Sequence, residues 1–266
     1  MKLEVTCPAK INTFLSVGPV DGAGYHPIRT IFQAVSLSDQ LIMQRADEDV
    51  FVCNDESVPV ENTVTRAWRL AKEYVELPKM QVTLDKNIPS MSGLGGGSSD
   101  AAGFLRGLIR MTKGRIGQKE AFEIACAVGA DVPFFLVGGR AIGEGYGELL
   151  TPLPDLPRRE IVIIKPDSGV SSGGAYAELD KHPRALAPIP EEPGFGSNDF
   201  ESVAPTASQN LLQTLRELDV EFCSLSGSGS AVFAFIGDHS QSDFVFPGCK
   251  TYFAHTLTRE ESLWIS

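Results

Sequence analysis

The sequence predicts an α+β protein made of two lobes. Strand patterns and helix patterns both recur along the 266 residues, but they do not alternate strictly, as they would in a doubly wound sheet. A proline-containing stretch, TPLPDLPRR, interrupts these patterns near residue 151 and is typical of a linker. The length allows two modest domains. We therefore expect an N-terminal lobe at residues 1–150 and a C-terminal lobe at residues 151–266.

The first lobe is expected to hold three strands and three helices. Alternating or short apolar runs predict the strands, at LEVT, at IFQAV and around Met80, Val82 and Leu84. Apolar residues three and four positions apart predict the helices, at Thr63–Glu76, Ser99–Thr112 and Lys119–Val128.

The second lobe has two segments typical of buried strands, EIVIIK and SAVFAFI, and a helix pattern at Ser208–Leu218. Between them lies the proline-rich stretch His182–Pro205. Because proline removes a backbone donor, we expect this stretch to be an extended excursion over the surface rather than core.

Composition excludes several classes of partner. The chain has 34 acidic and 23 basic residues, a net charge of −11, so we expect no nucleic-acid partner and no binding to anionic membranes. Its longest apolar runs, such as Val132–Val137, fall far short of the roughly 18 residues that span a bilayer. The first residues, MKLEVTCPAKINTFL, lack the apolar core of a signal peptide, which favours a cytoplasmic location.

The five cysteines are widely scattered and form no C-x-x-C pair. This pattern is typical of reduced thiols and argues against a structural zinc site. The sequence carries no signal for an oligomeric state.

The glycine-rich segment around Gly93–Gly97 is the most informative stretch. Four glycines within five residues let backbone N–H groups converge on one point, and Ser98 or Ser99 is expected to cap the helix that follows. Such a helix start binds anions, whereas a flexible connecting loop is the plainer interpretation. No Gly-Lys pair occurs in the chain, which excludes a Walker A loop, and Ser98 stands where a dinucleotide fingerprint needs glycine or alanine.

Two charged residues stand in unusual places. Lys10 lies among small and apolar residues of the first strand; taken alone, it fits an edge-strand lysine whose ammonium reaches water. Asp131 follows a predicted helix and precedes Pro133 and two phenylalanines, where a capping or turn aspartate is the plainer interpretation. A second turn of small residues, in SLSGSGSAVFAF, fits a simple hairpin as well as a binding loop.

Together these stretches resemble the GHMP kinase superfamily and, more narrowly, its 4-diphosphocytidyl-2-C-methyl-D-erythritol kinases. The family motifs P-A-K-I-N, G-Y-H, G-L-G-G-G-S-S, G-A-D-V-P-F-F and G-S-G-S correspond to Pro8–Asn12, Gly24–His26, Gly93–Ser99, Gly129–Phe135 and Gly227–Ser230. The segment GPVDGAGYH departs from the family, because Val20 replaces a basic residue and two residues are added after Gly22.

The resemblance implies a two-lobed GHMP kinase fold with its active site in the cleft between the lobes. It implies transfer of the ATP γ-phosphate to the 2-hydroxyl of the cytidyl alcohol, a step of the non-mevalonate isoprenoid pathway. Asp131 would be the general base, and Lys10 would keep it ionised and offset the charge on the transferred group. The implied cofactors are ATP and Mg²⁺, with Ser98 or Ser99 near the metal and the metal ligands left open.

The resemblance also implies two sets of binding residues. The ATP set comprises Pro89, Ser90, Met91, Ser92, Gly93, Leu94, Gly95, Gly96, Gly97, Ser98 and Ser99, with Asn62 and Lys86 as less specific candidates. The substrate set comprises Asn12 for the erythritol part, Tyr25 and Tyr176 as a sandwich around cytosine, His26 for its edge, and Ser172.

Two other functions remain open at this point. Another GHMP kinase would act on a small alcohol such as homoserine or mevalonate, but it would not need the Tyr25-His26 pair. A non-catalytic nucleotide-binding module could keep the glycine loop, but it would need neither Lys10 nor Asp131.

Overall fold

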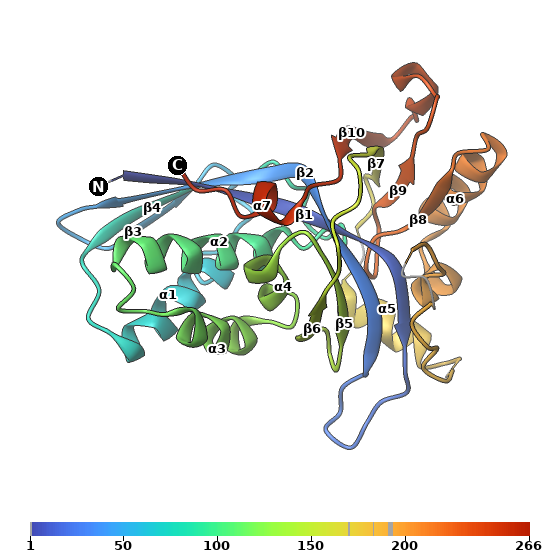
Figure 1. Cartoon of the computed structure of the whole chain (residues 1–266). Coiled ribbons are helices and arrows are strands. Elements are labelled where there is room, and N and C mark those ends of the chain that lie inside the picture. Colours follow the sequence, from blue (N-terminus) through green and yellow to red (C-terminus); the bar gives the residue numbers. More distant parts are fainter. Residues whose placement is uncertain (1, 170, 183, 191–193) are drawn as a thin grey trace.

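A computed structural model describes the protein at residues 2–169, 171–182, 184–190 and 194–266. Two sheets organise it, which confirms the α+β class (Figure 1). In the first sheet the order is β3-β4-β2-β5-β6, with β1 paired to β2. Its strands are β1 Lys2–Val17, β2 Ile28–Arg45, β3 Val50–Cys53, β4 Met80–Asp85, β5 Arg140–Glu144 and β6 Leu149–Pro152.

The second sheet has the order β10-β7-β9-β8 and is antiparallel throughout. Its strands are β7 Glu160–Pro166, β8 Phe222–Leu225, β9 Val232–Phe235 and β10 Cys249–His255. The chain passes from one sheet to the other between Pro152 and Glu160, within the expected linker. The division into lobes at residue 150 stays a prediction, because the last residues return to the first sheet, where Ser266 and Glu4 exchange backbone hydrogen bonds.

Helices α1 to α4 lie together on one face of the first sheet (Figure 1). The helices of the chain are α1 Thr63–Tyr74, α2 Gly96–Met111, α3 Gln118–Val128, α4 Val132–Val137, α5 Ser172–Leu179, α6 Thr206–Glu217 and α7 Arg259–Ser262, with short 3-10 helices η1 Asp199–Val203 and η2 Gln241–Phe244. The four helices expected from periodicity are confirmed, with ends shifted by up to three residues. None of the described helices is both long and apolar enough to cross a membrane.

The helix α2 begins three residues earlier than expected. Its N-cap is Gly95, in the left-handed conformation with φ 74°, so neither Ser98 nor Ser99 caps it. The expectation of a serine cap is wrong because glycine alone of these residues adopts this conformation without strain, and the helix therefore starts directly at the glycines.

β1 and β2 are the longest strands and tie the two lobes together. The expected segments LEVT and IFQAV are only parts of strands of 16 and 18 residues. Along β7, Ile161 and Ile163 pack with residues of β1 and β2, whereas Val162 and Ile164 pack with α5 and α6. The second sheet is therefore buried on both faces and covers the middle of β1, where the sequence has its buried lysine.

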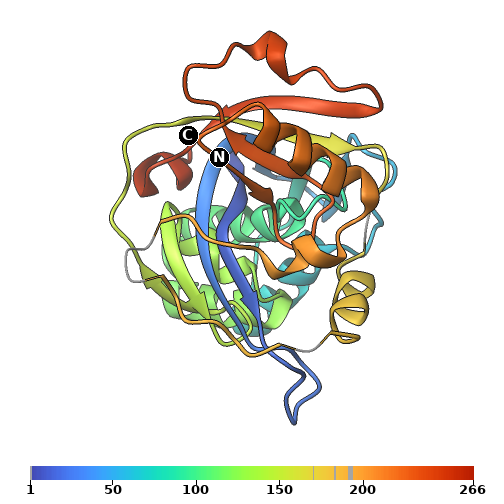
Figure 2. The same ribbon diagram turned by 90° about the vertical axis from the view of Figure 1, so that its right-hand side faces the viewer.

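The proline-rich stretch runs over the surface as expected, with most of its described residues exposed or half-buried, but its backbone is fastened to that of β1 from Gly196 on. Gly196 donates a backbone hydrogen bond to Thr13 (2.8 Å), and Leu15 donates one to Ser197 (3.0 Å). In Figure 2 this part of the chain passes in front of β1 and β2. The open edge of β1 offers unpaired backbone groups, and the stretch satisfies them. Residues 183 and 191–193 of the stretch lie outside the described part.

Candidate active site

A cavity of about 520 Å³ lies where the two lobes meet. Both lobes line it, which agrees with a site in the cleft between them. Among its lining residues are Lys10, Asn12, Phe32, Lys86, Pro89, Ser90, Met91, Ser92, Gly93, Gly95, Gly96, Gly97, Ser98, Asp131 and Tyr146 from the first lobe and Ser172, Tyr176, Phe200, Gly227 and Ser228 from the second.

The glycine loop is a fixed element and not a flexible connection. Leu94 accepts the backbone N–H of Lys10 (3.0 Å), and Ser92 accepts that of Ala231 (3.1 Å). Gly93 has φ 77°, and a Cβ there would lie 1.9 Å from the carbonyl oxygen of Ser226, so no other residue fits. The loop places the first turn of α2 at the cavity. The backbone N–H groups of this first turn have no partner within the helix. This arrangement is suited to bind phosphate.

The two serines after the glycines differ in their surroundings. Ser98 lines the cavity. Ser99 is fully buried, and its hydroxyl has no hydrogen-bond partner among the described residues. Two hydroxyl oxygens at one helix start are thus candidates for an additional ligand.

Lys10 is buried, with 3% of its side chain exposed. The ammonium therefore does not reach water as an edge-strand lysine would, because the second lobe covers this part of β1. The Nζ atom donates to Asn12 Oδ1 (2.6 Å) and lies 3.9 Å from Asp131 Oδ2. Burial lowers the pKa of Lys10 below its ordinary value, and the charge of Asp131 opposes this effect.

Asp131 stands at the N-cap of α4, but its side chain forms no cap hydrogen bond with the described helix start. The capping interpretation is therefore wrong. The carboxylate is 34% exposed and faces Lys10 within the cavity. Burial, followed by the charge of Asp131, raises the pKa of Tyr176 to about 12, so this ring stays neutral at physiological pH.

Asn12 connects Lys10 to the second lobe. Its Oδ1 accepts from Lys10 and from the backbone N–H of Gly227 (2.9 Å), and its Nδ2 donates to Thr30 Oγ1 (2.7 Å). The carbonyl of Gly227 in turn accepts from Asn198 (2.9 Å). The turn of small residues at Gly227 joins β8 to β9, so the hairpin interpretation is right, and the same turn also lines the cavity.

The altered loop GPVDGAGYH is closed by the side chain of Asp21. Its Oδ1 accepts the backbone N–H groups of Ala23 (2.8 Å) and Tyr25 (3.2 Å), and its Oδ2 accepts the hydroxyl of Tyr146 (2.8 Å). The hydrogen bond from Tyr146 is the main cause of a lowered pKa of Asp21. The ring of Tyr146 also lies beside that of Tyr25, with centroids 5.4 Å apart.

His26 lies against Tyr176, with ring centroids 4.8 Å apart in a stacked arrangement. Its Nδ1 donates to the carbonyl of Gly18 (2.9 Å), and its Nε2 lies 3.4 Å from Asp180 Oδ1. Tyr25 is 64% exposed and contacts Tyr146 instead. The structure thus brings His26 and Tyr176 together, while the sandwich of Tyr25 and Tyr176 around cytosine stays a prediction.

Asn62 and Lys86 border a smaller recess of about 240 Å³ beside the glycine loop. Asn62 caps α1, accepting from Val64 (2.9 Å) and Thr65 (3.1 Å). Lys86 is not a surface lysine: 8% of its side chain is exposed, and its Nζ contacts Asp39 and Asp100. Although burial lowers the pKa of Lys86, the two carboxylates outweigh this and hold it above its ordinary value.

Comparison with known proteins identifies the family. Residues 62–139 match the GHMP kinases N terminal domain. A 4-diphosphocytidyl-2-C-methyl-D-erythritol kinase of Polaromonas naphthalenivorans is 34% identical over 280 residues, covering 96% of this chain and 94% of the relative. One of Listeria monocytogenes is 32% identical over 272 residues, covering 95% and 94%. The chain belongs to the 4-diphosphocytidyl-2-C-methyl-D-erythritol kinase family.

Solved structures agree with this family. A crystal structure of 4-(cytidine 5'-diphospho)-2C-methyl-D-erythritol kinase matches with a TM-score of 0.81 and 30% identity, covering 95% of this chain and 98% of the other. A homoserine kinase of Cytophaga hutchinsonii matches with a TM-score of 0.72 at 16% identity, covering 100% and 97%, which shows the shared fold alone. The GHMP kinase fold is confirmed, and the chain is a phosphotransferase.

Several residues of this kinase site were missed from the sequence. Tyr146 carries no motif of its own, and only the fold brings it to the cavity. Asp39 and Asp100 could have been noticed, because each is a charged residue within an apolar strand or helix pattern, where a buried partner is needed.

Proposed function

We propose that the chain transfers the γ-phosphoryl group of ATP to the 2-hydroxyl of 4-diphosphocytidyl-2-C-methyl-D-erythritol, as a step of the non-mevalonate pathway. The observation that carries this proposal is the pair of Lys10 Nζ and Asp131 Oδ2, 3.9 Å apart. They share one cavity with the glycine loop. A nucleotide-binding module would have no use for a proton acceptor that faces a buried cation. A cytoplasmic location stays a prediction from the sequence.

The ATP phosphates are assigned to the glycine loop and the start of α2. The N–H groups of Gly96, Gly97 and Ser98 lie at the cavity and belong to the first helical turn, whose dipole favours negative charge. The recess at Asn62 and Lys86 adjoins the cavity and shares Lys86, Ser90 and Gly97 with it. We assign the remainder of the nucleotide to this recess.

Asp131 is assigned as the general base. Phosphoryl transfer needs an aligned hydroxyl, charge neutralisation at the γ-phosphate and little covalent chemistry. A carboxylate without a cap hydrogen bond is free to accept the proton of the 2-hydroxyl. Lys10, held by Asn12, stabilises the ionised carboxylate and offsets charge on the transferred group.

The residues at the start of α2 fit a magnesium ion that is bound mainly through the phosphates. Within the described part of the chain, no cluster of three His, Cys, Asp or Glu side chains could hold a metal by itself. Mg²⁺ in kinases takes one or two protein oxygens and completes its shell with phosphate and water. The partnerless hydroxyl of Ser99 and the hydroxyl of Ser98 at the cavity are such oxygens. When bound, the ion supplies charge neutralisation between the phosphates.

Cytosine recognition is assigned to the end of the cavity near Tyr176. Since Nδ1 of His26 donates to Gly18, Nε2 is the ring nitrogen left for the edge of the base, and it lies 3.4 Å from Asp180 Oδ1. Tyr176 offers a neutral aromatic face, Ser172 borders the cavity, and Asn12 lies at the polyol end. Tyr25 contributes a second face if its loop moves toward Tyr176 when substrate binds.

The test measures ADP release with four alcohols at equal concentration. The cytidyl alcohol should be phosphorylated with a kcat/KM at least about 10²-fold above that of methylerythritol phosphate, homoserine and mevalonate, because these leave the groups for the base unpaired. His26→Ala should reduce this ratio, because it should lower kcat/KM for the cytidyl alcohol alone. Comparable rates with homoserine or mevalonate would reject the substrate and leave the kinase fold intact.

A further inference from the structure

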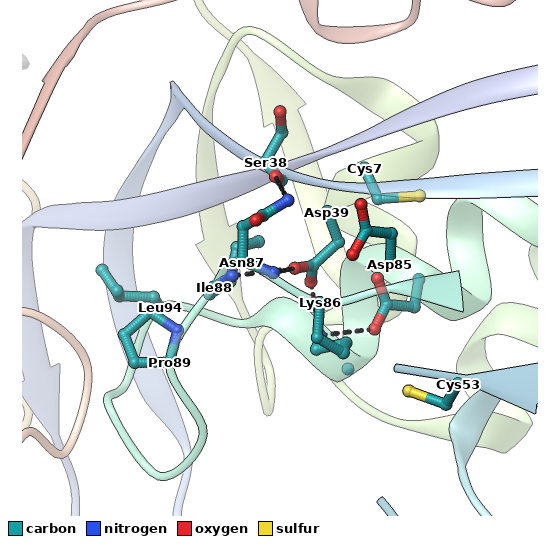
Figure 3. A network of polar contacts seen from close by, with 12 residues as sticks. Cys7, Ser38, Asp39, Cys53, Asp85, Lys86, Asn87, Ile88, Pro89 and Leu94 are labelled. Carbon is teal, nitrogen blue, oxygen red and sulfur yellow. Dashed lines mark hydrogen bonds and ion pairs between the residues drawn. The ribbon is translucent and has the colours of Figure 1, made fainter. Parts of the chain in front are cut away.

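A buried cluster of ionisable side chains lies behind the glycine loop, where Lys86, one of the candidates for the ATP side, meets Asp39 and Asp100. Lys86 donates to Asp39 and to Asp100 Oδ2, the latter at 2.7 Å. The exposed fractions of the three side chains are 8%, 0% and 3%. Figure 3 shows Asp39 of β2 pointing at Lys86 and at the backbone of Asn87 and Ile88. Burial, followed by the charge of Asp39, raises the pKa of Asp100 well above its ordinary value. Burying three ionisable side chains together is costly, which points to a role beyond stability.

The carboxylate of Asp39 holds the entry to the glycine loop. Its Oδ1 accepts the backbone N–H groups of Asn87 (2.5 Å) and Ile88 (2.8 Å), directly before Pro89. Its Oδ2 accepts from Lys86. The side chain of Asn87 also donates to the carbonyl of Ser38 (3.2 Å), so this segment is fastened to β2 twice.

Lys86 connects this entry to the exit of the loop. Asp100 is the fifth residue of α2, and its Oδ2 accepts from Lys86. A Cβ at Gly96 would lie 3.2 Å from Lys86 Nζ and 3.0 Å from Ile88 Cγ2, so glycine lets the first turn approach this closely. The same ammonium group therefore bonds directly to Asp100 at the exit of the loop, and it is linked to the entry through Asp39, which accepts the backbone N–H of Ile88.

The two carboxylates are not equivalent. Asp39 accepts three hydrogen bonds and has no exposed surface. Asp100 accepts one, and its Oδ1 has no partner among the described residues. An amide at position 39 can keep its oxygen on the backbone N–H groups of Asn87 and Ile88 only by turning its NH₂ group toward the Lys86 ammonium. An amide at position 100 can still present its oxygen to Lys86.

We propose that Asp39 is a positioning residue for ATP, which acts by fixing the entry of the glycine loop and, through Lys86, the start of α2. The inference rests on the proposed function in one respect, namely that this loop binds the ATP phosphates. Asp39 itself touches neither ATP nor the reacting atoms.

The test compares Asp39→Asn with a matched control, Asp85→Asn. Asp85 adjoins Lys86 in sequence, is exposed and bonds to Asn54, not to Lys86 or to the loop backbone. Binding of a non-hydrolysable ATP analogue and of the cytidyl alcohol is measured by calorimetry, with KM and kcat beside them. Asp39→Asn should raise the Kd of the ATP analogue roughly tenfold or more and change the Kd of the cytidyl alcohol by less than about twofold. Asp100→Asn should have a smaller effect, and Asp85→Asn none.

A purely structural role would lower the melting temperature and leave ATP binding by the folded variant unchanged. That result overturns the proposal, as does an equal loss for both ligands. If Asp39→Asn does not fold, the double variant Asp39→Asn/Lys86→Met is used instead, because it also removes the ammonium that Asp39→Asn leaves without one of its two carboxylates. It is compared with Lys86→Met alone. Equal KM values for ATP in these two variants also overturn the proposal. Wild-type protein that binds the ATP analogue but does not phosphorylate the cytidyl alcohol rejects the proposed substrate and leaves this inference standing.

Discussion

Replacing Asp131 by asparagine tests the assignment of the general base most directly. The amide keeps the shape of the side chain and loses the ability to take a proton. Loss of a positioned general base typically costs about 10² to 10⁴ in rate. We therefore expect kcat to fall by roughly this factor, while the KM values for ATP and for the cytidyl alcohol change by less than about tenfold.

The structure indicates that this loss will not be a consequence of unfolding. Asp131 forms no cap hydrogen bond with α4, and its carboxylate is 34% exposed. Its contact with Lys10 is 3.9 Å long, and Lys10 keeps its 2.6 Å hydrogen bond to Asn12 in the variant. Because Asp131 is partly exposed but Lys10 is buried, losing this carboxylate should cost more than an exposed ion pair and less than a fully buried one, roughly 2 kcal/mol. The melting temperature should therefore fall by about 4–8 °C.

The assay is continuous ADP release at saturating ATP and cytidyl alcohol, together with a thermal melt of the same sample. Asp85→Asn, which removes a carboxylate outside the cavity, is the control and should retain wild-type kcat. A kcat of Asp131→Asn within threefold of wild type would reject Asp131 as the base. A melting temperature lower by more than about 10 °C would show instead that the carboxylate has a structural role.

Two further predictions follow from the electrostatics and the altered loop. Burial lowers the pKa of Lys10, so its ammonium loses its proton before the pH reaches the ordinary value of 10.5, and kcat/KM should fall at that lower pH. An NMR titration of Lys10 in Asp131→Asn should give a still lower pKa, because the variant lacks the carboxylate charge that opposes the effect of burial. An alkaline limb at or above 10.5 would contradict this. Tyr146→Phe keeps the ring beside Tyr25 and loses the hydrogen bond to Asp21. The KM for the cytidyl alcohol should therefore rise roughly two- to fivefold, with the KM for ATP unchanged. Equal changes in both KM values would show that the loop does not help to bind the cytidyl alcohol.

The sequence alone determined the fold class, the family and the local chemistry of the motifs. Helix periodicity depends on neighbours three and four residues apart, so α1, α2, α3 and α6 could be predicted within a few residues. The glycines of the loop also act locally, since backbone conformation is a property of each residue. The order of the motifs identified the family, because all of them occur along one chain in the order that the family has.

Only the tertiary structure decided which charges meet. Lys10 and Asp131 are 121 positions apart, and without the fold each was explained as well by an edge strand or a helix cap. The burial of Lys10 comes from the second sheet, which packs across β1, and this packing depends on contacts that no local pattern encodes. The same holds for Lys86, whose two carboxylates come from β2 and α2. A buried charge is tolerated only where distant elements bring its partner, and that placement is a property of the whole fold.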